Sequence, residues 1–237
     1  MKIQRRLPPL SSALSLYENK NKKIGGAVFL CLVVFMAGCV DKTSRSQGIY
    51  MLLDTSGTYA KELSKANSII KYLLGTLQPG DSLAVARIDS ASFSEKDIIA
   101  KVTFDNRPSV ANQQKRLFSQ QVDEFISKVK GSSYTDISGG LLQAVEYLNE
   151  TGAGKKLILI YSDLEEELAK GHVRDFPIPL SGFNVVALNV TKLRTDIIDP
   201  RKYLNRLEYW RKRVESGNGH WRVINDLDRP EKILTLE

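Results

Sequence analysis

Residues 48–57 read Gly-Ile-Tyr-Met-Leu-Leu-Asp-Thr-Ser-Gly, and this stretch decides the fold. Its apolar run, residues 49–53, is followed at once by an aspartate and a short polar turn. A strand with one face in water alternates apolar and polar residues, whereas a strand of a parallel sheet is covered on both faces and is continuously apolar. The stretch therefore predicts a central parallel strand that carries Asp54 to the edge of a sheet.

The segments that follow alternate between strand and helix patterns. Further strands are expected at 82–88, 156–161, 184–190 and 221–224, with a more alternating edge strand, which could be antiparallel, at 97–104. Helices are expected at 58–77, 108–129, 136–149, 199–215 and 229–236. This alternation predicts an α/β fold: an open, twisted, mostly parallel sheet with helices on both faces, in three layers.

Composition and charge describe an ordinary globular body behind a basic leader. Apolar residues make up 42% of the chain and charged residues 26%, as in folded domains. The net charge of +7 would suit a nucleic-acid partner, but residues 1–38 hold six of the 34 basic residues and one of the 27 acidic ones. The body is therefore nearly balanced, and we expect no nucleic-acid partner.

Residues 24–40 are uncharged and follow Lys20, Lys22 and Lys23, which is the pattern of a secretory signal. The run ends in Met36-Ala37-Gly38-Cys39, which resembles the lipobox of bacterial lipoproteins. That resemblance implies a signal peptide at 1–38, a lipidated Cys39 with a linker to residue 47, and a domain at 48–237. Val40 after the cysteine, in place of Asp, implies the outer membrane. The alternative is an uncleaved anchor helix.

The cysteines limit the chemistry of the body. Both of them, Cys31 and Cys39, lie within the apolar leader. The body therefore has neither a disulfide framework nor a cysteine-based metal site or nucleophile.

Three polar segments stand where the carboxyl ends of parallel strands bind ligands. They are Asp54-Thr55-Ser56-Gly57-Thr58, the run Ser132 to Leu141 around Thr135-Asp136, and Ser162-Asp163. In this order they resemble the metal-ion-dependent adhesion site of the von Willebrand factor type A domain family. The resemblance implies that the metal ligands are Asp54, Ser56, Thr58, Thr135 and Asp163. Two positions depart from the pattern: Thr58 replaces a serine, and Leu164 stands where glycine is common.

The ligand types agree with a divalent cation. Carboxylate and hydroxyl oxygens suit Mg²⁺, or alternatively Mn²⁺ or Ca²⁺. Two carboxylates only balance the charge of the ion, so it can accept a further carboxylate from the Asp or Glu of a protein partner, as the family resemblance implies. We therefore expect an envelope-anchored, cation-dependent adhesion or scaffold module and not an enzyme, with the membrane contacted through the N-terminal lipid.

Other interpretations remain at this point. Asp54 and Ser56 could be turn residues, with Thr135 as a helix N-cap. The motifs also resemble Mg²⁺-dependent haloacid-dehalogenase-like phosphatases, but these place a second aspartate as general acid where this chain has Ser56. A third possibility is a structural envelope lipoprotein with a vestigial metal site.

The acidic run Glu165-Glu166-Glu167 beside Asp163 also has two interpretations. The first is the opening turn of a helix, in which acidic residues complement the dipole and Asp163 and Glu166 have capping-box spacing. The second is an acidic rim of the metal site.

Overall fold

The computed structural model describes residues 45–57, 59–88 and 94–235, and residues Ser44–Glu237 form one compact unit. The expected signal peptide, the lipidated Cys39 and Thr58 lie outside the described residues. Among the residues that are described, no helix is both long and apolar enough to span a bilayer.

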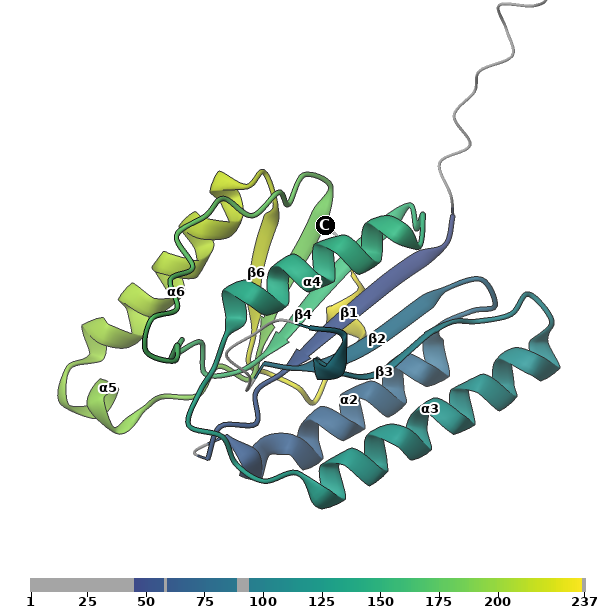
Figure 1. The fold of residues 1–237 in the computed structure, drawn as a ribbon, viewed down its shortest axis with the longest axis horizontal. Coiled ribbons are helices and arrows are strands. Elements are labelled where there is room, and N and C mark those ends of the chain that lie inside the picture. Colours follow the sequence, from purple (N-terminus) through teal and green to yellow (C-terminus); the bar gives the residue numbers. More distant parts are fainter. Residues whose placement is uncertain (1–44, 58, 89–93, 236–237) are drawn as a thin grey trace, which may run out of the picture. The chain divides into compact units, whose positions relative to one another are not determined.

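A six-stranded sheet forms the centre of this unit (Figure 1). Its strands lie in the order β3-β2-β1-β4-β5-β6, and every neighbouring pair is parallel except β2 and β3. The strands are β1 (Gln47–Leu53), β2 (Ser82–Arg87), β3 (Ile98–Thr103), β4 (Lys155–Tyr161), β5 (Phe183–Leu188) and β6 (His220–Ile224). The mostly parallel sheet and its antiparallel edge strand are both confirmed.

Helices cover the two faces of the sheet and complete the three expected layers (Figure 1). They are α2 (Leu63–Thr76), α3 (Pro108–Lys128), α4 (Ile137–Glu150), α5 (Arg194–Ile198), α6 (Pro200–Ser216) and α7 (Glu231–Leu234), with 3-10 turns η1 (Ala60–Glu62) and η2 (Glu95–Asp97). The buried residues of α2, α3 and α7 pack on one face, and those of α4 and α6 pack on the other. The last helix is shorter than expected, and α5 was not predicted.

Strand β1 is buried on both faces, as its sequence requires. Ile49, Met51 and Leu53 belong to the core beneath α2 and α3. Tyr50 and Leu52 belong to the core beneath α4 and α6. All five side chains are inaccessible to solvent, so the continuous apolar run reflects two cores that meet at one strand.

The strand order reverses between β1 and β4. The chain proceeds from β1 to β2 and β3 on one side, and then returns to place β4 on the other side of β1. The loops that leave these two strands therefore diverge at the carboxyl edge of the sheet, where ligands of open α/β sheets bind. Asp54 and Asp163 follow β1 and β4 at this position.

Candidate metal centre

Three loops at the carboxyl edge are held together by backbone hydrogen bonds. Gly57 N donates to Ser132 O at 3.1 Å, and Ser132 N donates to Thr55 O at 3.1 Å. Thr135 N donates to Glu167 O at 2.8 Å, and Glu167 N returns a bond to Thr135 O at 2.9 Å. The loops after β1, before α4 and after β4 therefore form one assembly, although more than 70 residues of chain separate Gly57 from Ser132.

Asp54 is fixed at the centre of this assembly. Its amide donates to Tyr161 O at 3.0 Å, and its side chain is only 1% exposed. One carboxylate oxygen accepts the amide of Ser56 at 2.8 Å, and the other accepts the hydroxyl of Ser162 at 2.7 Å. Both carboxylate oxygens of Asp54 are thus oriented by neutral donors.

Asp163 supplies the second carboxylate and is 4% exposed. Burial raises the pKa of Asp163 to about 6, aided by the negative charge of Asp54 and opposed by the hydrogen bond from the Glu165 amide at 3.0 Å. Two buried carboxylates within reach of each other's field favour a cation between them, because a divalent ion offsets both charges. The donor set at the ends of β1 and β4 therefore fits a hard divalent metal.

The remaining predicted ligands are hydroxyl residues. Ser56 is half-buried and Thr135 is buried, and each lies in one of the three joined loops. In the described part of the chain, no group of three or more His, Cys, Asp or Glu residues could hold a metal ion by itself. A metal at this edge would therefore need the hydroxyl oxygens in addition to the two carboxylates.

Leu164 keeps the backbone conformation that glycine favours. Its φ angle is +67°, in the left-handed region. Its amide donates to the Ser162 hydroxyl at 2.9 Å, its carbonyl accepts from the Trp210 indole at 3.0 Å, and its side chain is 1% exposed. The departure from glycine is thus accommodated by burial of the leucine in the core, and the turn is retained.

The interpretation of the acidic run Glu165-Glu166-Glu167 as the opening turn of a helix is wrong. The residues from Asp163 to Glu166 are not helical, so the acidic run does not open a helix of its own. Instead, Glu166 accepts the amide of Ser138 at 2.7 Å and its hydroxyl at 3.2 Å, and so complements the N-terminus of α4 from another loop.

The N-cap of α4 is Asp136 and not Thr135. The Asp136 carboxylate accepts the amide of Gly139 at 2.7 Å, and Arg174 pairs with it at 2.7 Å. The hydroxyl of Thr135 is therefore not required for capping, which agrees with a role as a ligand.

Sequence reasoning missed a charged residue behind the site. The side chain of Arg206 on α6 is 8% exposed and pairs with the buried Asp196 at 2.8 Å. It also donates to the carbonyl of Asp163 at 2.8 Å and contacts Glu165 at 3.3 Å. The helical spacing of α6 carried no signal for these contacts, because all three partners lie outside α6.

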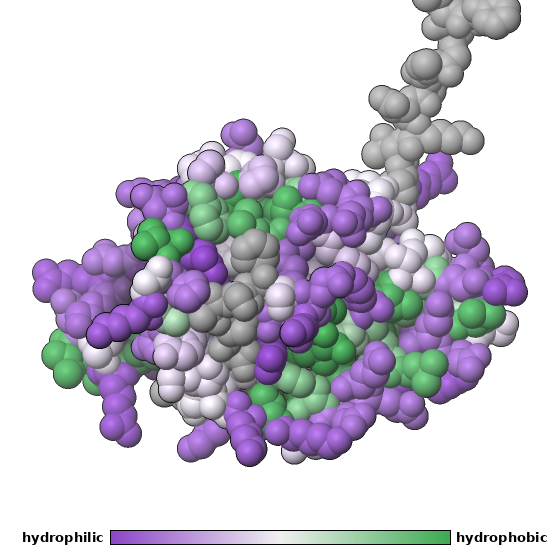
Figure 2. All heavy atoms as spheres, viewed as in Figure 1, coloured by the Kyte–Doolittle hydropathy of each residue, from purple (hydrophilic) through white to green (hydrophobic). Residues whose placement is uncertain are grey.

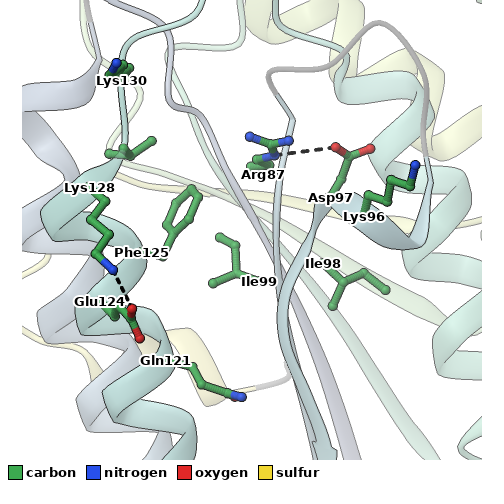
Figure 3. A pocket seen from close by; sticks show the side chains of 11 residues that line it. Arg87, Lys96, Asp97, Ile98, Ile99, Gln121, Glu124, Phe125, Lys128 and Lys130 are labelled. Atoms are coloured by element: carbon green, nitrogen blue, oxygen red, sulfur yellow. Dashed lines mark hydrogen bonds and ion pairs between the residues drawn. The ribbon is translucent and has the colours of Figure 1, made fainter.

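A separate cavity of about 570 Å³ lies between β3 and the end of α3 (Figure 3). None of the predicted metal ligands lines it. On the strand side of the cavity Arg87 pairs with Asp97 at 3.5 Å, and on the α3 side Lys128 pairs with Glu124 at 2.5 Å (Figure 3). The cavity therefore does not enclose the candidate metal centre.

Comparison with known proteins identifies the fold. No family model and no curated protein matches the sequence. Among solved structures, a von Willebrand factor type A protein from Catenulispora acidiphila superposes with a TM-score of 0.53 at 14% identity, over 80% of this chain and 41% of that one. The domain has the von Willebrand factor type A fold.

A second structure agrees. The pilus adhesin SpaC of Lactobacillus rhamnosus GG, in its open conformation, matches with a TM-score of 0.51 at 12% identity, over 81% of this chain and 29% of that one. The chain thus spans less than half the length of either neighbour, and the likeness lies in the von Willebrand factor type A fold alone.

Proposed function

We propose that this chain is a divalent-cation-dependent protein-binding module of the bacterial envelope, acting in adhesion or as a scaffold. The cation is held by Asp54, Ser56, Thr58, Thr135 and Asp163. The observation that carries the proposal is the pair of buried carboxylates at the carboxyl ends of β1 and β4, in loops that hydrogen bonds hold together. The SpaC neighbour is a pilus adhesin, which fits this function.

The ligand chemistry explains why such a site binds and does not react. Two carboxylates neutralise a divalent ion and the hydroxyls add no charge, so the ion remains able to attract one more anionic oxygen. A carboxylate of Asp or Glu on a partner protein is the ligand that we propose for this position. The cation is Mg²⁺, with Mn²⁺ or Ca²⁺ as alternatives of the same hard character.

The phosphatase alternative lacks a proton donor. Two residues after Asp54 stands Ser56, whose amide holds the Asp54 carboxylate at 2.8 Å. A serine hydroxyl does not protonate a leaving group at neutral pH. The full chain is therefore expected to release no p-nitrophenol from p-nitrophenyl phosphate in Mg²⁺; turnover that Asp54→Asn abolishes would instead support the enzyme.

We further propose that residues 1–38 are removed as a signal peptide and that Cys39 carries the lipid that anchors the chain in the outer membrane. Two or more acyl chains give stable anchoring, whereas one chain binds reversibly. Labelling with radioactive palmitate should mark the wild-type chain and not Cys39→Ser. A mature mass that still includes residues 1–38 would favour the uncleaved anchor helix.

Calorimetry with the full chain in detergent tests the metal site. Mg²⁺ or Mn²⁺ should bind the wild-type chain, and Asp54→Ala and Asp163→Ala should each remove the binding heat. Asp105→Ala is a matched control, because Asp105 is bound by Arg107 beyond the end of β3, outside the three loops. Metal binding that is intact in Asp54→Ala would contradict the assigned ligands.

Crosslinked capture from native envelopes tests the binding function. A partner should be retained by the wild-type chain in Mg²⁺, released by EDTA, and not retained by Asp54→Ala. Capture that EDTA leaves unchanged would favour a structural lipoprotein with a vestigial metal site.

A further inference from the structure

The short helix α5 presents two large apolar side chains to solvent. Ile197 is 76% exposed and Ile198 is 87% exposed, and we call this pair the α5 tip. Figure 2 shows hydrophobic atoms over α5, at the lower left of the view, surrounded by hydrophilic ones. Single exposed apolar residues are common, but two adjacent isoleucines on a projecting element are typical of an interaction site.

The α5 tip is held in place by buried charges. The side chain of Asp196, the residue before it, is fully buried and accepts the amide of Leu193 at 2.8 Å. Arg206 of α6 pairs with the same carboxylate at 2.8 Å. These contacts fix α5 on the domain, so its isoleucines are exposed by a defined structure and not by fraying.

The same arginine joins the α5 tip to the candidate metal centre. Arg206 donates to the carbonyl of Asp163 at 2.8 Å while it pairs with Asp196. One buried side chain therefore links the backbone carbonyl of Asp163, the residue that supplies the second carboxylate, to Asp196, the residue that precedes Ile197. The tip and the metal loops both follow the carboxyl ends of parallel strands, since α5 follows β5 and Asp163 follows β4.

The charges around the α5 tip are positive. Asp196 is paired with Arg206, and Asp199 is paired with Arg201 at 2.9 Å. Three further cations are exposed and have no ion pair within the described part of the chain: Lys192, Arg194 and Lys202. A surface with an apolar centre and a basic rim is complementary to a partner surface that has an apolar centre and an acidic rim.

We infer that the α5 tip is a second docking point for an acidic protein partner, which covers Ile197 and Ile198 with apolar side chains while one of its carboxylates reaches the cation. This inference rests on the proposed function and adds the chemistry of the partner. The basic rim faces acidic residues of that partner. A protein is favoured over a lipid surface because Arg206 links the tip to Asp163 of the candidate metal centre, for which the proposed further ligand is a protein carboxylate.

The test uses the full chain in nanodiscs of neutral phosphatidylcholine and a fluorescent synthetic peptide in which acidic residues flank a pair of leucines. In Mg²⁺ the wild-type chain should bind the peptide, and the double variant Ile197→Ser/Ile198→Ser should bind it at least about tenfold more weakly, as expected for apolar anchor residues. Leu117→Ser is the control, because Leu117 is an exposed leucine of α3. It should bind as the wild type does.

Two control peptides distinguish the contribution of the apolar side chains to binding from that of the acidic side chains. Replacing the leucines by serine should reproduce the loss seen in the double variant, and replacing the acidic residues by glutamine should abolish binding. Equal binding by the wild type and the double variant would overturn the inference, as would failure of the wild type to bind the peptide in Mg²⁺. Loss of flotation with phosphatidylglycerol vesicles in the double variant, without competition by the peptide, would overturn it in favour of a membrane.

Calorimetry on the same samples distinguishes a failure of the proposed metal-dependent function from a failure of the inference about the α5 tip. If the double variant still binds Mg²⁺ but loses the peptide, both proposals stand. If Mg²⁺ does not bind the wild-type chain, the proposed function fails, whatever the peptide does. If EDTA abolishes peptide binding while the isoleucine variant binds normally, only the α5 tip is refuted.

Discussion

The hydroxyl of Ser162 donates to Asp54 at 2.7 Å, and both residues are buried. Ser162 follows β4 and Asp54 follows β1, so this bond joins the two strands between which the strand order reverses. The same hydroxyl accepts the amide of Leu164, so one side chain orders both the carboxylate and the turn beside it.

Ser162→Ala should therefore destabilise the domain and weaken its metal site. A buried carboxylate that loses a donor costs about 1–3 kcal/mol in the free energy of unfolding, because water cannot replace the bond. Urea unfolding in EDTA measures this loss, and calorimetry should show a parallel loss of Mg²⁺ affinity. Ser68→Ala, which removes an exposed hydroxyl bonded to Ser64 O, should change stability by less than about 0.5 kcal/mol. Equal effects of the two variants would refute the ordering role of Ser162.

The sheet was predictable because its signal is local. The apolar run before Asp54 indicates a strand that is buried on both faces of the sheet. The order of strands and helices along the chain restricts the topology of the sheet to a few possibilities. Asp54 and Asp163 could be assigned to one edge for the same reason, since carboxyl ends of parallel strands meet there. The two cores on either side of β1 confirm this logic.

The contacts behind the site could not be predicted, because they depend on distant pairs. Glu166 lies beside Asp163 in sequence, and its local spacing wrongly indicated a helix, whereas it binds the start of α4. Arg206 could not be distinguished in the sequence from the exposed Arg201 of the same helix, although it is buried against Asp196. Helical periodicity predicts which face of a helix a residue occupies. It gives no information about which groups of a neighbouring loop contact that face.

Arg206→Ala should be strongly destabilising. It leaves the fully buried carboxylate of Asp196 without its counter-ion, and breaking a buried pair in this way costs about 3–5 kcal/mol. Thermal and urea unfolding measure the effect. Arg211→Ala is the matched control on the same helix, because Arg211 pairs with Glu208 and Glu215 in partly exposed positions, where ion pairs contribute little to stability. Similar losses in both variants would contradict the buried role of Arg206.

Leu164→Gly sets two effects of opposite sign against each other. Glycine relieves a left-handed conformation that costs a leucine about 1–2 kcal/mol. It also removes a buried side chain, and truncating a buried leucine costs about 2–5 kcal/mol. The loss of packing outweighs the relief of strain, so the variant should be less stable by roughly 1–3 kcal/mol in urea unfolding. A more stable variant would mean that backbone strain outweighs packing at this turn.

Mg²⁺ binding should weaken as the pH falls through about 6. The pKa of Asp163 is raised to about 6 in the metal-free chain, chiefly by burial, and a protonated carboxyl is a poor ligand. Affinity should therefore fall by up to about tenfold per pH unit below that value, because a proton competes with the ion. Calorimetry from about pH 7.5 down to about pH 5 measures the slope.

The metal-free and metal-bound chains should respond to pH in opposite directions. In EDTA, the raised pKa of Asp163 means that its contribution to stability is present below its ordinary pKa and is lost as the pH rises through about 6. In Mg²⁺, the ion stabilises the ionised form, so the increase in melting temperature that Mg²⁺ causes should grow over the same range. Asp163→Asn should abolish both trends, since it cannot titrate. A Mg²⁺-induced shift that is constant with pH would remove Asp163 from the proposed ligands.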